Sequence, residues 1–138
     1  MTVEEAGRRW AETWERGWAV HDVEAIVALY AEGAGFLTSP FRETQLGPSG
    51  VREYVEWAFA DEASAEARFG QPVVAGNDRA VGEWWTVSRS AGGEESTLAG
   101  VSLLRFGADG LVTQQYDYWH VEPGRRQPHE HFGRWPQR

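Results

Sequence analysis

Asp117 lies near the end of the sequence within an aromatic run, Tyr116-Asp117-Tyr118-Trp119. The alternation around it is typical of a strand, so Asp117 and Trp119 share one face, and we expect that face to be buried. A carboxyl group among apolar side chains costs free energy unless it is paired or used in chemistry. Burial also raises its pKa toward the range of a general acid or base. Asp117 is therefore the candidate catalytic residue.

The register of the neighbouring strands predicts what lies beside Asp117. We expect the last three strands at residues 79–89, 97–106 and 111–121. If tight hairpins join them, Asp117 faces inward in one row with Gly100 and Thr86. Gly100 has no side chain and would leave room for a ligand. The adjacent inward rows are expected to be Trp84, Ser102 and Gln115, and Ser88, Leu98 and Trp119.

A set of polar and aromatic residues is predicted to bind the ligand around Asp117. It consists of Trp14, Tyr30, Arg42, Tyr54, Trp84, Thr86, Ser102, Gln115 and Trp119. Arg42 follows the first predicted strand, where it could bind a carboxylate at the pocket mouth. A second interpretation stays open, in which Thr86, Gln115 and Tyr30 hold Asp117 in a purely structural polar cluster.

Helices are expected ahead of these strands. Residues 2–19 carry tryptophans at four-residue spacing, and Asp22 is a good N-cap for a second helix that continues through Tyr30. A short strand at 36–38, a third helix from residue 47 and a strand at 65–75 follow. Helices first and antiparallel strands afterwards predict an α+β fold.

Composition excludes several classes of function. The chain has 138 residues, which favours one domain over 1–138, and its net charge of −8 disfavours nucleic acid or an anionic membrane as a partner. It contains no cysteine, and all 13 basic residues are arginine, so thiolate and Schiff-base chemistry are excluded. His129 and His131 lack an acidic companion cluster, and we expect no metal site. No signal peptide or membrane span is evident, which predicts a cytoplasmic location.

Several phrases resemble the nuclear transport factor 2-like superfamily, in its polyketide-cyclase-like (SnoaL-like) branch. They are AIVALYAEGAGF, Ser39-Pro40-Phe41, the helix start from Gly47 to Tyr54, GEWWTV, LAGVSLLRF and DGLVTQQYDYWH. The resemblance covers about residues 5–121 and leaves residues 122–138 as a docking tail containing Phe132 and Trp135. It implies a cone-shaped half-barrel, with three N-terminal helices packed in a strongly curved, mainly antiparallel sheet around a deep hydrophobic pocket. It also implies a homodimer through the outer sheet face, with Tyr116, Tyr118, Trp85 and Val101 at the interface.

The resemblance also implies a function. Asp117 matches the acid/base aspartate of polyketide cyclases, which implies a small hydrophobic ligand and cofactor-free isomerase, cyclase or dehydratase chemistry. The last-strand phrase also looks like that of limonene epoxide hydrolase. Here, however, Trp84 and Thr86 stand where that enzyme has an arginine and a second aspartate, so its route is not expected. The alternative is a non-catalytic ligand-binding or dimeric accessory module of the same fold.

Overall fold

The computed structural model describes residues 1–133 and contains three helices, of which the first two have N-cap side chains that the sequence shows. They are α1 (Val3–Val20), α2 (Val23–Val27) and α3 (Gly47–Ala60). The Thr2 hydroxyl accepts a hydrogen bond from the Glu5 amide, and the Asp22 carboxylate accepts one from the Ala25 amide. These bonds satisfy amides that the first turn of a helix leaves free. In residues 1–133 no helix is both long and apolar enough to cross a membrane.

The strands form one curved sheet. They are β1 (Tyr30–Leu37), β2 (Gln45–Leu46), β3 (Glu62–Phe69), β4 (Val73–Ala75), β5 (Arg79–Ser90), β6 (Glu95–Phe106) and β7 (Val112–Pro123). Their order is β2-β1-β7-β6-β5-β3, with β4 beside β5. The pair β1–β7 is parallel, and the other pairs are antiparallel. The expected α+β fold is confirmed. The curved sheet forms an unclosed cone, and the helices pack inside it.

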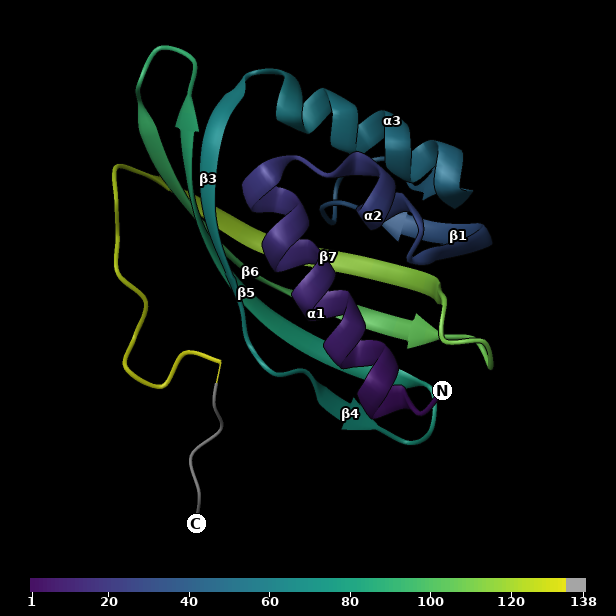
Figure 1. Cartoon of the computed structure of the whole chain (residues 1–138). Helices are drawn as coiled ribbons and strands as arrows, with labels where there is room; N and C mark the ends of the chain where they lie inside the picture. Colours follow the sequence, from purple (N-terminus) through teal and green to yellow (C-terminus); the bar gives the residue numbers. More distant parts are fainter. Residues whose placement is uncertain (134–138) are drawn as a thin grey trace.

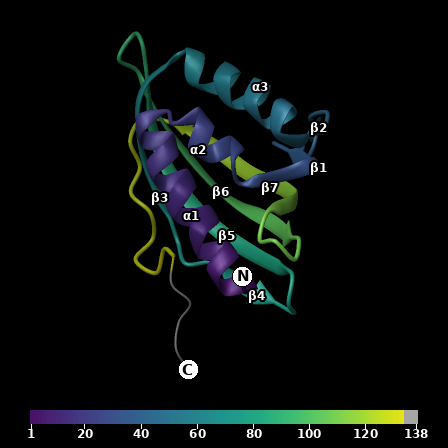
Figure 2. The same cartoon turned by 45° about the vertical axis from the view of Figure 1, so that its right-hand side comes forward.

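The helices and the C-terminal segment lie on opposite faces of the sheet. Figures 1 and 2 show α1 crossing the inner face of the sheet in front of β5, with α3 above it. The segment that follows β7 runs along the outside of the sheet. The core between helices and sheet is rich in fully buried side chains, among them Trp10, Ile26, Phe36, Val51 and Val55. This inner layer positions the candidate site.

Three sequence-based expectations about local structure are wrong. The single strand expected at 65–75 is divided into β3 and β4. Tyr30 does not end the second helix, because α2 ends at Val27 and Tyr30 opens β1. The predicted register of the last strands is also off by two residues. Asp117 pairs with Ser102, which pairs with Gly82, and the expected pairing with Gly100 and Thr86 does not form.

The error in the β6–β7 register has a local cause in the hairpin that joins these two strands. The connection is longer than a two-residue turn, with the Gly107 amide bonded to the Leu111 carbonyl, and the pairing shifts between Arg105 and Phe106. A bulge inserts a residue without a partner and moves every later pair. Because the total shift is two residues, every side chain keeps its predicted face. The inner face therefore holds the predicted residues, but each one lies beside different residues of the neighbouring strands.

Candidate functional site

A cavity of about 300 Å³ lies between the inner face of the sheet and helices α1 and α3. Its size is at the lower end of the range for pockets that hold drug-sized molecules. Its aromatic lining consists of Trp10, Trp14, Trp18, Phe36, Tyr54, Trp57, Phe59, Phe69, Trp84 and Trp119. Polar groups interrupt this lining at a few places, and Asp117 is one of them.

One oxygen of Asp117 is held by the protein, and the other is open. Asp117 Oδ1 accepts a hydrogen bond from the Ser102 hydroxyl at 2.6 Å and one from the Gln115 amide at 3.0 Å. No side chain or backbone group of residues 1–133 donates to Oδ2, although Asp117 lines the cavity. When the carboxyl group is protonated, its proton therefore sits on Oδ2, facing the cavity.

The surroundings of Asp117 hold its pKa near neutrality. Burial raises the pKa of Asp117 to about 7, while the hydrogen bonds from Ser102 and Gln115 oppose that rise. Near pH 7 the group is thus divided between its acid and base forms. A group in this state can both take up and deliver a proton.

A buried hydrogen-bond network fixes Gln115 beside Asp117. The side-chain oxygen of Gln115 accepts bonds from the Trp10 indole at 3.0 Å and from the Tyr30 hydroxyl at 2.5 Å. Tyr30 in turn accepts a bond from the Trp14 indole at 3.0 Å. The Gln115 amide is thereby oriented with its nitrogen toward Asp117. Burial and the charge of Asp117 raise the pKa of Tyr30 well above its usual range, so Tyr30 remains protonated.

A similar pair of hydrogen bonds fixes Ser102, the second side chain that binds Asp117. The Trp84 indole donates to the Ser102 oxygen at 3.1 Å, so Ser102 is left to donate its own proton to Asp117. Both supports of Asp117 are therefore anchored by tryptophans, which are rigid and bring a single N–H donor. The many tryptophans of the sequence therefore form this hydrogen-bond network as well as part of the core.

Aromatic and cationic groups stand where the cavity reaches α3. The Arg42 guanidinium lies 4.9 Å from the Trp57 ring centre and 5.9 Å from that of Tyr54. Burial and the charge of Asp117 raise the pKa of Tyr54, so its hydroxyl remains a donor. The Trp119 indole donates to the Thr38 carbonyl at 2.6 Å, which ties β7 to the end of β1.

The predicted site residues fall into two groups. Trp14, Arg42, Tyr54, Trp84, Ser102, Gln115, Asp117 and Trp119 line the cavity. Tyr30 and Thr86 do not belong to that lining; Tyr30 is buried and bonded to Gln115, and Thr86 is buried with a hydroxyl that has no partner in residues 1–133. Sequence reasoning did not select Trp18, Phe69 or Glu62, which also line the cavity.

The role expected for Gly100 is also corrected. A Cβ at Gly100 would lie 2.8 Å from the Trp84 ring and 2.7 Å from the Trp119 Cβ. The missing side chain thus admits two tryptophans instead of leaving space for a ligand. Gly82, which stands in the Asp117 row, plays the same part for Trp10, whose ring lies 2.6 Å from a Cβ placed there. Within residues 1–133 no cluster of side chains suited to hold a metal ion is present.

Comparison with solved structures shows the same fold in distant proteins. An NTF2-like protein of unknown function from Exiguobacterium sp. 255-15 is 16% identical, with 83% of this chain and 98% of that chain covered and a TM-score of 0.70. For RV0760c from Mycobacterium tuberculosis the identity is 18%, the coverage 90% and 100%, and the TM-score 0.75. A hexachlorocyclohexane dehydrochlorinase (LinA), type 2, gives 12% identity, 91% and 93% coverage, and a TM-score of 0.74. No protein with a curated function matches the sequence.

The family comparison covers most of the residues that build this cavity, but it ends before Asp117 and Trp119. The model of the SnoaL-like domain matches residues 8–115, which run from α1 to the middle of β7. Helices inside a curved sheet, the cavity between them and this match agree with the resemblance noted from the sequence. The chain belongs to the SnoaL-like domain family of the nuclear transport factor 2-like superfamily.

Proposed function

We propose that this protein binds a small hydrophobic molecule in the aromatic cavity and that Asp117 performs acid–base chemistry on it without a cofactor. The observation that carries the proposal is the open Oδ2 of Asp117, on a carboxyl group with a pKa of about 7 in an aromatic-lined cavity. Proton abstraction next to a carbonyl, as in an isomerase or cyclase, needs one base and a donor for the developing oxyanion. Tyr54 and Arg42 line the same cavity and supply the donors.

The test uses 2-tetralone, whose C1 protons are acidic because they lie next to a carbonyl and a ring. Exchange of these protons for deuterium is followed by NMR with wild type, Asp117→Asn, and the control Asp109→Asn in the exposed β6–β7 turn. We expect wild type and the control to accelerate exchange, and Asp117→Asn to lose about 10²-fold or more. The wild-type rate should rise with pH and level off above about pH 7, where Asp117 is ionised.

The same experiment distinguishes catalysis from the alternative function, which is ligand binding without catalysis. Anchoring of both Ser102 and Gln115 by tryptophans favours it, because such rigidity also serves to hold a polar group of a ligand. If 2-tetralone quenches tryptophan fluorescence saturably but exchanges no faster with protein, catalysis is overturned and binding stands. If it neither binds nor exchanges, the proposed ligand class is wrong.

We also propose a homodimer that uses the part of the outer sheet face left open by the C-terminal segment. Tyr118, Leu103 and Val81 are exposed on this face, whereas Trp85 contacts Phe132 and donates to the Arg126 carbonyl. The interface therefore lies nearer Tyr118 than Trp85. Tyr118→Glu should shift the mass measured by light scattering from dimer to monomer, and Tyr118→Phe should not. A cytoplasmic location stays a prediction from the sequence.

A further inference from the structure

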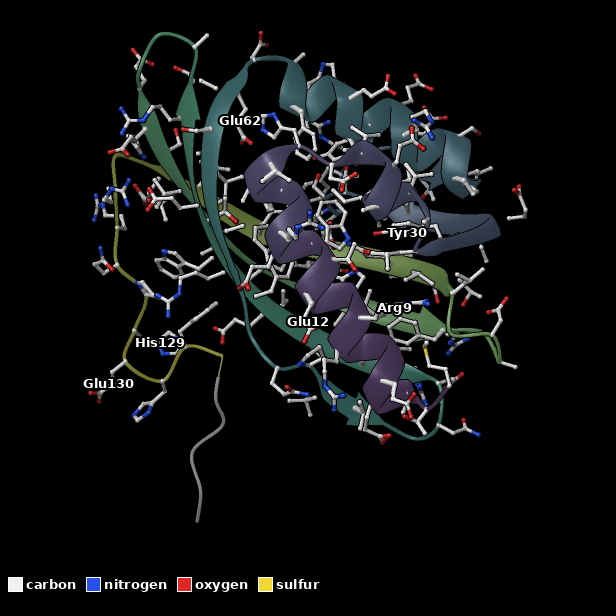
Figure 3. The ribbon with its side chains drawn as sticks, viewed as in Figure 1. Arg9, Glu12, Tyr30, Glu62, His129 and Glu130 are labelled. Atoms are coloured by element: carbon white, nitrogen blue, oxygen red, sulfur yellow. The ribbon has the colours of Figure 1, made fainter. Side chains whose placement is uncertain are left out.

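A second carboxylate, Glu62 at the start of β3, lines the cavity at a distance from Asp117. Figure 3 shows Glu62 near the C-terminal end of α1, well away from Tyr30. The Asp117 row crosses β5 at Gly82, whereas Glu62 bonds to Ser88, about 20 Å further along that strand. The cavity thus has two polar ends.

Glu62 is held by a side chain of α1, by His21 directly after that helix, and by a side chain of β5. Its oxygens accept bonds from the Trp18 indole at 3.1 and 3.3 Å, from the Ser88 hydroxyl at 2.5 Å, and face His21 Nε2 at 2.8 Å. The His21 ring stacks on Phe59 with 4.3 Å between centres and is not part of the cavity lining. Glu62 is therefore fixed in place with its side chain largely buried.

The Glu62 end offers hydrogen-bond acceptors to the cavity. A carboxylate has about four acceptor positions, and Trp18, His21 and Ser88 together place two contacts on each oxygen of Glu62, so the free acceptor at this end is the oxygen of Ser88. Ser88 gives its proton to Glu62, so the lone pairs of its oxygen are free to accept. Asp61 adds a further acidic side chain to the lining, and Arg42, the one arginine of the lining in residues 1–133, lies against Tyr54 and Trp57 and forms an ion pair with neither Asp61 nor Glu62.

An aromatic wall joins the two ends. The Trp84 indole bonds to Ser102 at the Asp117 end, and its ring lies 5.6 Å from that of Trp18, which bonds to Glu62. Phe69 stacks on Trp84 at 6.2 Å. Flat aromatic surfaces of this kind favour an aromatic ligand packed along them.

We propose that the Glu62 end binds the hydrogen-bond donor of an elongated aromatic ligand, a phenolic hydroxyl or an amino group, while Asp117 meets a carbonyl at the other end. This inference rests on the proposed function, because it assigns the ligand class of the same cavity. A ligand with a hydrogen-bond acceptor or a negative charge at the Glu62 end is disfavoured, since acceptors would face acceptors there.

The probes are four biphenyls that carry an acetyl group at position 4 and differ at position 4′: hydroxyl, amino, methoxy or carboxylate. Binding is measured with wild-type protein by tryptophan fluorescence and calorimetry, so the main result requires no variant. We expect the hydroxyl and amino probes to bind about tenfold or more tightly than the methoxy probe, and the carboxylate probe to bind most weakly.

Glu62→Gln should reduce the hydroxyl-to-methoxy ratio to less than about threefold. The matched control is Glu66→Gln, on the same strand but on the outer face, where the carboxylate pairs with Arg125; it should keep the full ratio. If Glu62→Gln does not fold, Ser88→Ala provides a second variant and should lower the ratio partway.

The outcomes separate this inference from the proposed function. Equal binding of the hydroxyl, amino and methoxy probes overturns the role of Glu62 and leaves the Asp117 pocket intact. A preference that persists in Glu62→Gln overturns it as well. If no probe binds while 2-tetralone does, the elongated ligand is wrong; if neither binds, the proposed hydrophobic pocket itself is wrong.

Discussion

The two faces of strands β5, β6 and β7 carry polar residues in very different settings. On the inner face, Gln115 and Ser102 are buried and bonded to tryptophans and to Asp117. On the outer face, Glu83 is partly exposed and binds the C-terminal segment through the Gly133 amide at 3.0 Å and His129 at 3.2 Å. On the inner face buried protein groups supply these bonds, with the Thr86 hydroxyl as an exception in residues 1–133, whereas the bonds on the outer face lie at the surface.

The contrast shows which polar residues the fold depends on. A buried donor that loses its partner bears the full desolvation penalty, whereas an exposed one turns to water. Ion pairs on the outer face, such as that of Arg125 with Glu95, are exposed and add little each. We therefore expect inner-face substitutions to change stability strongly and outer-face substitutions to change it modestly, without effect on the cavity.

Gln115→Leu should destabilise the protein most, by about 4 kcal/mol, because it leaves the Trp10 indole and the Tyr30 hydroxyl without their acceptor in the core. Urea unfolding measures the change. Gln114→Leu, one residue away with its side chain on the outer face, is the control and should change stability by less than about 1 kcal/mol. Similar losses in both variants would contradict the contrast between faces.

Asp117 should make stability depend on pH. Its pKa is about 7 in the folded state against 3.8 in a free chain, so the folded state binds the proton more tightly. The contribution of Asp117 to stability is then largest below pH 4 and is lost as the pH rises through about 7. Between pH 5 and pH 8 wild type should lose about 3 kcal/mol more than Asp117→Asn. Unfolding at both pH values checks this, and parallel profiles would show that Asp117 is not held protonated.

Phe132→Ala tests the outer face. Phe132 is buried against Trp85 at 6.3 Å, and the Arg68 guanidinium lies 5.1 Å from its ring centre. Its removal should lower stability by about 2 kcal/mol, because the segment it anchors is peripheral. Ligand binding in the cavity should stay within about twofold of wild type. A large loss of binding would mean that the outer segment controls the cavity.

Thr86→Val should change the free energy of unfolding least of these substitutions, and the change should be stabilising where the others are destabilising. The Thr86 hydroxyl is buried and has no hydrogen-bond partner in residues 1–133, and valine has nearly the same shape. Removing this group should leave stability unchanged or raise it by about 1 kcal/mol. Thermal unfolding measures the shift. Destabilisation by more than 1 kcal/mol would indicate a buried partner for Thr86, such as a water molecule.

Much of the site followed from the alternation of residues along single strands. Asp117, Trp119, Ser102 and Trp84 face inward as predicted, because a side chain's face depends only on whether its position is odd or even. The docking of Phe132 was also expected. Trp135, named with it, lies outside the described residues.

The tertiary structure decided which of these residues meet. The longer β6–β7 connection and the bulge beside Arg105 together moved Asp117 from Gly100 to Ser102, and no local pattern marks either feature. Glu62 reached the cavity through contacts with Trp18 and Ser88, which are far from it in the chain. Sequence periodicity fixes the direction of a side chain, which is a local property. Register, hydrogen-bond partners and the second end of the cavity depend on packing between distant segments, and only the folded chain defines them.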